Sequence, residues 1–281
     1  MLGKLFKHDM RTLSRPLRFV VLGIICLALL AAFCLAIEVR QADSYANEWN
    51  DDYTRMLQST MAYTGMIVLL ALGMGAGIAV IAVFIFVHYY RSMFSDEGYL
   101  THTLPVKSWE ILLSKVLSAA VWMIIGAVSI VLGIFIILLL GTSGDTLFNT
   151  QILLDIGGMF DNLREAGALG TTLLILPELL TNMLAGMLQI YLAITIGCAI
   201  ANRHRVWAAI GIYIAIGVCN NIINTVFTVP SIISMVSQMY ESPSLSAING
   251  VLAVDIIKNS AIAAGCFFWI KYLLKRKLNL Q

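Results

Sequence analysis

Six long runs of hydrophobic residues, separated by polar segments, dominate the pattern of this chain. A helix needs about 20 predominantly apolar residues to cross the hydrocarbon core of a bilayer, and each run reaches about that length. The runs cover residues 19–37, 63–87, 112–140, 171–201, 206–227 and 251–270. The pattern therefore predicts an all-α, polytopic membrane protein with six transmembrane helices.

The fourth run is interrupted by two residues, Pro177 and Glu178. A proline inside a helix removes one backbone hydrogen bond and kinks or breaks the helix. We therefore expect a break, or a re-entrant entry, at this point near the outer leaflet.

The composition supports a membrane protein and excludes several other classes. Of the 281 residues, only 12% are charged and 59% are hydrophobic, whereas charged residues make up about a quarter of a soluble protein. The near balance of 18 basic and 16 acidic residues, without a basic aromatic surface, argues against nucleic acid as a partner. The five cysteines all lie in apolar runs and have no metal-ligand spacing, so we interpret them as small core residues.

The positions of lysine and arginine predict the orientation of the spans, because cytoplasmic connections carry an excess of both residues. Fourteen of them lie in the leader, the connections after the second and fourth runs, and the tail; three lie in the opposite connections. Both termini are therefore expected in the cytoplasm. The chain has no transit peptide or Asn-x-Ser/Thr site, which favours a multi-pass protein of a bacterial plasma membrane.

Two amphipathic segments lie outside the runs. In residues 1–18, leucines recur at helical spacing opposite a lysine- and arginine-rich face. This pattern predicts an elbow helix in the cytoplasmic interface that turns at Pro16 into the transmembrane domain, residues 19–281; an ordinary basic leader is the alternative. The outer segment 141–170 has a similar apolar face and is expected to lie along the outer surface.

The cytoplasmic loop of residues 91–111 has the signals of a compact helical hairpin. Ser95 can cap a short helix with Asp96 and Glu97 in its first turn, where negative charge is favourable. Pro105 ends that helix, and Ser108 can cap the next one. The loop would expose its acidic residues beside an apolar ridge formed by Phe94, Tyr99, Leu100 and Leu104. Any well-formed loop could share these signals.

This loop resembles the corresponding segment of type-2 permeases of ATP-binding cassette (ABC) transporters. The resemblance rests on the acidic, glycine-containing turn 96–100, on Leu104-Pro105-Val106, and on a following helix with Ser114-Lys115. Six spans, cytoplasmic termini and an amphipathic leader agree with that family over nearly the whole chain. The chain departs from some members by having no fused ATPase and a long outer segment between the third and fourth spans.

The resemblance implies a permease subunit of an ABC exporter that forms the pathway with a second permease, a copy or a paralogue. ATP and Mg²⁺ would bind a separate cytoplasmic ATPase, so this chain would hold no cofactor and perform no catalysis. The loop between the second and third spans would be the coupling helix that docks on the ATPase. Its docking residues would be Phe94, Asp96, Glu97, Gly98, Tyr99, Leu100 and Thr103.

The residues themselves agree with a chain that is not an enzyme. The sequence has no glycine-rich phosphate loop ending in Gly-Lys-Ser/Thr and no HExxH motif. Its four histidines are scattered at the expected cytoplasmic edge, and no Ser/His/Asp set is evident.

Polar residues within the spans are candidates for lining a transport pathway. They are Gln189 in the fourth run and Asn220, Asn221 and Asn224 in the fifth. Hydrogen bonding between helices is the alternative role. In the sixth run, Asp255 and Lys258 lie on one helical face and are expected to form a structural pair.

Two other classes of function remain open. A stand-alone channel or secondary carrier would need buried charges for ion coupling, and the inner halves of the spans offer almost none. A membrane scaffold or immunity protein without transport is the second alternative.

Overall fold

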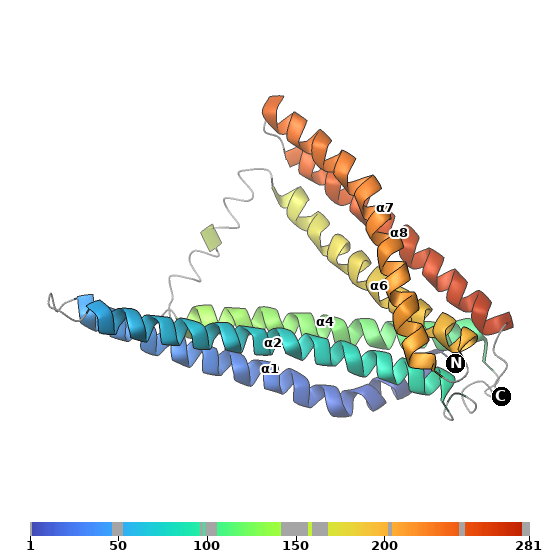
Figure 1. Cartoon of the computed structure of the whole chain (residues 1–281), viewed down its shortest axis with the longest axis horizontal. Coiled ribbons are helices and arrows are strands. Elements are labelled where there is room, and N and C mark those ends of the chain that lie inside the picture. Colours follow the sequence, from blue (N-terminus) through green and yellow to red (C-terminus); the bar gives the residue numbers. More distant parts are fainter. Residues whose placement is uncertain are drawn as a thin grey trace. The chain divides into compact units, whose positions relative to one another are not determined.

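The computed structural model describes residues 2–46, 53–95, 98, 106–141, 157–158, 168–201, 204–241 and 245–276. Every long regular element in these ranges is a helix (Figure 1). In chain order they are α1 (Leu2–Ala46), α2 (Tyr53–Phe94), α4 (Ser108–Gly141), α6 (Leu169–Ile200), α7 (Arg205–Glu241) and α8 (Leu245–Arg276). The all-α prediction is confirmed for the described residues.

All six helices are long and apolar enough to cross a membrane. The qualifying segments are Leu2–Ile37, Leu70–Phe94, Ser108–Leu140, Leu169–Ile200, Arg205–Ser234 and Ile248–Lys275. Each overlaps one of the six predicted runs, so the prediction of six such helices is confirmed. Their orientation and the identity of the membrane stay predictions.

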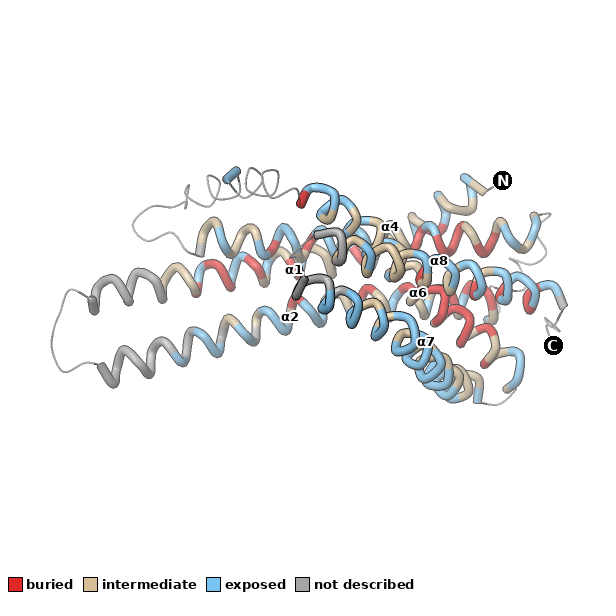
Figure 2. Tube along the Cα trace, turned by 90° about the horizontal axis from the view of Figure 1, so that it is seen from above, coloured by how far each residue is buried: buried red, intermediate tan, exposed pale blue. Residues whose placement is uncertain are grey.

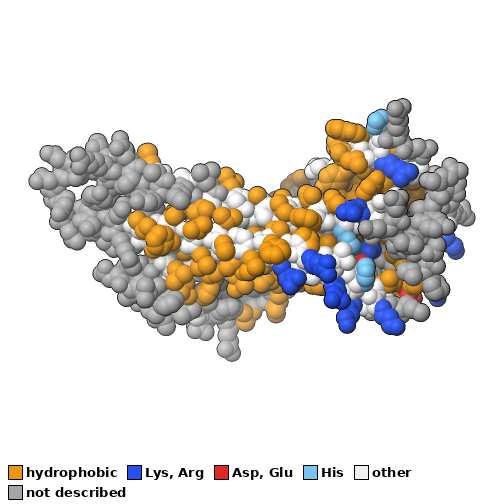
Figure 3. Space-filling view, turned by 90° about the horizontal axis from the view of Figure 1, so that it is seen from below, with side chains coloured by type: hydrophobic (Ala, Val, Ile, Leu, Met, Phe, Trp, Pro, Cys, Tyr) orange, Lys and Arg blue, Asp and Glu red, His pale blue; other side chains and the backbone are white. Residues whose placement is uncertain are grey.

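The helices expose large hydrophobic side chains along most of their length. On the face shown in Figure 3, hydrophobic side chains cover much of the described surface, and several Lys and Arg side chains form a separate group beside them. Helix α7 is the extreme case, because no residue in its most apolar stretch is buried (Figure 2). Water contact with so much apolar surface costs about 25 cal/mol per Å², whereas lipid tails remove that cost.

Two prolines that were expected to break helices lie inside continuous ones. Helix α6 runs through Pro177, so the predicted break or re-entrant entry there is wrong. The Thr181 hydroxyl shares its single hydrogen between the carbonyl groups of Pro177, at 2.8 Å, and Glu178, at 3.0 Å. These two carbonyl groups are not the one that the proline leaves without a donor, which belongs to Leu173, four residues earlier. Helix α1 likewise contains Pro16, so a separate elbow helix over residues 1–18 stays a prediction.

One compact unit comprises residues 8–85 and 121–161, which include most of α1 and α2 and the second half of α4. Glycines allow these three helices to approach closely. A Cβ atom added at Gly77 would lie 2.6 Å from the Ile24 side chain, and one at Gly133 would lie 3.1 Å from Ala28 Cβ. Small residues at helix interfaces permit this packing inside a membrane.

The second unit comprises residues 1–7, 86–120 and 162–281. Helix α6 packs against both α7 and α8, and its buried residues are concentrated between Ala185 and Gly197. The same unit contains the last turns of α2 and the first turns of α4, which flank the predicted cytoplasmic loop. This unit holds both candidate sites described next.

Candidate functional site

A polar cavity of about 460 Å³ lies among α6, α7 and α8. Helix α6 contributes Glu178 and Asn182, and α8 contributes Asp255, Lys258 and Asn259. From α7 come Asn220, Asn224, Thr225, Thr228 and Val229. Nine of these ten side chains are polar, although 59% of the residues in the chain are hydrophobic. Polar side chains are therefore strongly concentrated at this cavity.

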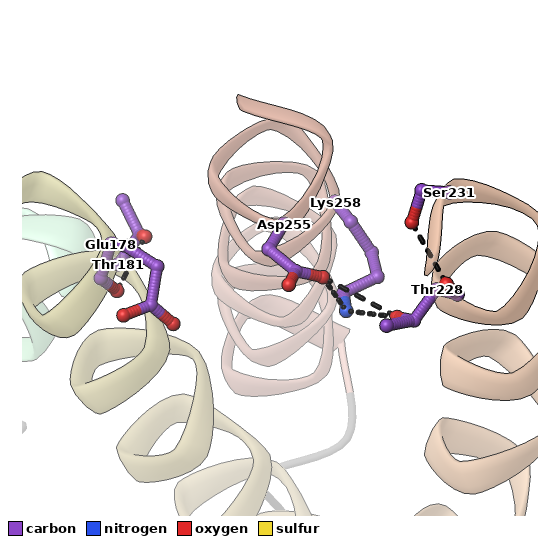
Figure 4. Close-up of polar contacts among 6 residues, drawn as sticks. All are labelled: Glu178, Thr181, Thr228, Ser231, Asp255 and Lys258. Atoms are coloured by element: carbon purple, nitrogen blue, oxygen red, sulfur yellow. Dashed lines mark hydrogen bonds and ion pairs between the residues drawn. The ribbon is translucent and has the colours of Figure 1, made fainter. Parts of the chain in front are cut away.

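An ion pair lies at one side of the cavity (Figure 4). Lys258 Nζ is 2.6 Å from Asp255 Oδ1, and it also donates to Thr228 Oγ1 at 3.4 Å. The Thr228 hydroxyl in turn donates to Asp255 Oδ1 at 3.4 Å. The Lys258 side chain is only 9% exposed and that of Asp255 is 21% exposed. The predicted pair between these two residues is confirmed, and Thr228 connects it to α7.

The four predicted pathway residues take different positions. Asn220 and Asn224 line the cavity. Asn221 is exposed, and its Nδ2 donates to the carbonyl oxygen of Gly217 one turn earlier, at 3.0 Å. Gln189 is 8% exposed and does not line the cavity. The structure thus brings together two of the four, and a pathway role stays a prediction for all of them.

The sequence also contained a signal for two lining residues that were not predicted to line a pathway. Glu178 and Asn182 are four residues apart and therefore share one face of α6. The expected break at Pro177 concealed this relation, because it placed Glu178 at the end of a helix.

The cavity lies far from the end of the unit that carries the C-terminal basic residues. Asp255 precedes Lys271 by about 24 Å of helix, and Thr228 follows Arg205 by about 35 Å, at 1.5 Å per residue. The hydrocarbon core is about 30 Å thick. With the predicted orientation, the cavity is therefore in the outer half of the membrane, reaching the level of the lipid headgroups.

A second cluster joins the last turns of α2 to α6. The rings of Tyr89 and Tyr191 stack with centroids 3.9 Å apart, and Phe86 packs edge-on against Tyr191. Tyr89 is fully buried, and its hydroxyl is 2.9 Å from Thr195 Oγ1. Since the Thr195 hydroxyl donates its single hydrogen to the Tyr191 carbonyl group at 2.7 Å, Tyr89 is the donor to Thr195.

Two of the predicted docking residues are described, and both lie next to this cluster. The Phe94 ring packs against Tyr89, with centroids 6.1 Å apart, and its carbonyl oxygen accepts a 3.5 Å bond from Arg205. Gly98 N–H donates to the Ser95 carbonyl oxygen at 2.7 Å, which closes a turn. A Cβ atom at Gly98 would lie 2.6 Å from a backbone oxygen, so the turn requires glycine. The other docking residues lie outside the described residues: Asp96, Glu97, Tyr99, Leu100 and Thr103.

The described residues contain no group of three or more His, Cys, Asp or Glu side chains arranged to hold a metal ion. Comparisons of this chain with protein-family models, curated proteins and solved structures found no match.

Proposed function

We propose that this chain is the transmembrane permease subunit of an ABC exporter. It forms the pathway with a second permease subunit and is driven by a separate ATPase that docks on the cytoplasmic loop. One observation carries the proposal beyond the resemblance of the loop: both ends of that loop belong to the same compact unit as the helices that form the polar cavity.

The contacts provide a physical route between the two sites. Movement of the loop would displace Phe94, which packs on Tyr89, and Tyr89 is held to α6 by its stack with Tyr191 and its bond to Thr195. From Tyr191, helix α6 continues for about 14 Å to Asn182 at the cavity. A packed helix moves as a rigid element, so displacement at one end changes the cavity at the other.

The first test measures whether an ATPase subunit is retained on the purified permease. A triple variant would reverse the charge at Asp96 and Glu97 and combine this with Leu100→Ala. If these residues dock the ATPase, the variant loses the ATPase or hydrolyses ATP without transport, while its yield and melting temperature stay unchanged. A few anchor residues usually carry most of the binding energy of an interface, so three changes suffice.

A matched control reverses two acids on the opposite side of the predicted topology, Asp51 and Asp52, and should retain the ATPase. Full retention with undiminished transport in the triple variant would reject the docking assignment. Absence of any co-purifying ATPase from the native chain would reject the proposal itself.

One observation favours a second candidate, a secondary carrier. Glu178, Asp255 and Lys258 gather in one cavity, and charges within spans often serve ion coupling. The two candidates differ in their energy source. Transport in membrane vesicles that follows ATP and resists an uncoupler supports the exporter, whereas transport that follows an ion gradient without ATP supports the carrier.

A further inference from the structure

The charges that line the cavity do not cancel. Asp255 neutralises Lys258 at 2.6 Å. The Glu178 carboxylate makes no hydrogen bond or ion pair with any described residue, although it lines the same cavity (Figure 4). Glu178 is half-buried, and with Asp255 matched to Lys258 it adds a formal negative charge to the cavity that no described side chain offsets.

Asn259 is a second polar group in the cavity that lacks a partner. The residue is only 9% exposed, lines the cavity, and its side-chain amide makes no hydrogen bond to a described residue. Its amide atoms are accessible from the cavity, so a bound ligand with polar groups can form hydrogen bonds with them.

We infer that the cavity binds the ammonium group of a cationic amphiphile, with Glu178 as its counter-charge and Asn259 as a hydrogen-bond partner. An anion is disfavoured, because the lysine of the cavity is already held by Asp255. A divalent metal ion is also disfavoured, since such ions take several oxygen ligands and only one carboxylate is free.

The surroundings of the cavity indicate that the ligand also has an apolar part. Val229 contributes an apolar side chain to the cavity lining, and the helices that form the cavity expose large hydrophobic residues elsewhere on their surfaces. The volume of about 460 Å³ falls within the 300–1,000 Å³ typical of small-molecule sites. As a substrate site, the cavity rests on the proposed function; as a binding site, it is measured on the purified chain without an ATPase, so the two can fail separately.

Three fluorescent probes that differ in one end group test the assignment. Dansylcadaverine carries an ammonium group, the dansyl amide of pentylamine carries none, and the dansyl amide of aminohexanoic acid carries a carboxylate. Fluorescence anisotropy with the purified chain in a neutral detergent gives the affinity for each probe. We expect the ammonium probe to bind about tenfold more tightly than the neutral one, as a single charged hydrogen bond provides.

Three variants test whether Glu178 is the residue that binds the ammonium group of the probe. Glu178→Gln should weaken the ammonium probe about tenfold and leave the neutral probe unchanged. Glu178→Asp retains the charge and should recover part of the lost affinity. Glu38→Gln removes an acid from α1, outside the cavity lining, and should change neither probe.

Equal binding of the ammonium and neutral probes to the native chain overturns the inference, as does preferential binding of the carboxylate probe. These comparisons need no variant, so they decide the question even where Glu178→Gln fails to fold. An equal loss of both probes in a folded Glu178→Gln variant also overturns it. Displacement by phosphatidylethanolamine, but not by phosphatidylglycerol, would assign the ammonium group to a lipid. Displacement by free alkylamines alone would assign it to a soluble amphiphile, and either result supports the inference.

Discussion

The contact between α6 and α7 at Gly197 allows a quantitative prediction about packing in the cavity-bearing unit. A Cβ atom at Gly197 would lie 2.7 Å from the Cα and N atoms of Ala209 and 2.8 Å from its Cβ. An ordinary contact begins at 3.4 Å. Gly197→Ala therefore forces the two helices apart by about 0.7 Å, because the nearest atoms are backbone and no side-chain rotation can relieve the overlap.

The expected cost of Gly197→Ala is about 1–3 kcal/mol, the usual range for overpacking a core. At a length of 281 residues, that corresponds to a melting temperature lower by about 2–5 °C. Gly186→Ala on the same helix is the matched control, since nothing lies within 4 Å of its added Cβ atom. The control should melt at the native temperature or slightly above it, because alanine has a higher helix propensity than glycine.

The assay is thermal unfolding of the purified variants in one detergent, followed by light scattering or intrinsic fluorescence. Adding Ala209→Gly to Gly197→Ala should restore little of the lost melting temperature, since the overlap with the Cα and N atoms of residue 209 remains. If Gly197→Ala melts at or above the temperature of Gly186→Ala, the close approach of α6 and α7 is refuted.

Three further predictions concern the tyrosine cluster, the ion pair and the topology. Tyr89→Phe removes one hydrogen bond, so we expect a loss of about 1 kcal/mol in unfolding experiments. Thr195→Val should cost more, because it leaves the buried Tyr89 hydroxyl without its acceptor; an equal cost would contradict the assigned donor. Lys258→Met alone should lower the melting temperature by several degrees, and adding Asp255→Asn should restore most of it, since the unpaired charge is the main penalty; additive losses would contradict this. Tags at both termini should be accessible only from the cytoplasm and a reporter near Asn50 only from outside; accessibility of all three from one side would reject the predicted topology.

The six helices could be predicted from sequence because each contains an apolar run of about 20 residues or more, and this signal is carried by each run separately. The predicted helix break at Pro177 was wrong because it, too, was judged from one run by itself. A lone proline removes one hydrogen bond and favours a break, but packing against neighbouring helices decides whether the helix continues, and α6 runs through Pro177. The sequence around a proline does not show whether neighbouring helices will keep the helix continuous.

The cavity could be predicted only in parts. Spacing along one helix identified the asparagines of α7 and the Asp255–Lys258 pair. That these face each other, together with Glu178 and Asn182 from α6, depends on how three helices pack, which periodicity does not encode. The stack of Tyr89 on Tyr191 was also inaccessible, since a tyrosine in an apolar run has no local signal for its partner.

The ion pair between Asp255 and Lys258 has a consequence for biosynthesis. Both residues belong to α8, three positions apart, so the pair closes within a single helix and requires no neighbour. The last span can therefore leave the insertion machinery with its two charges already matched, at a lower cost of partition into lipid than two separate ions would impose. Glu178 forms no such pair within α6, so insertion of α6 into a bilayer would not be eased by an ion pair on the same helix.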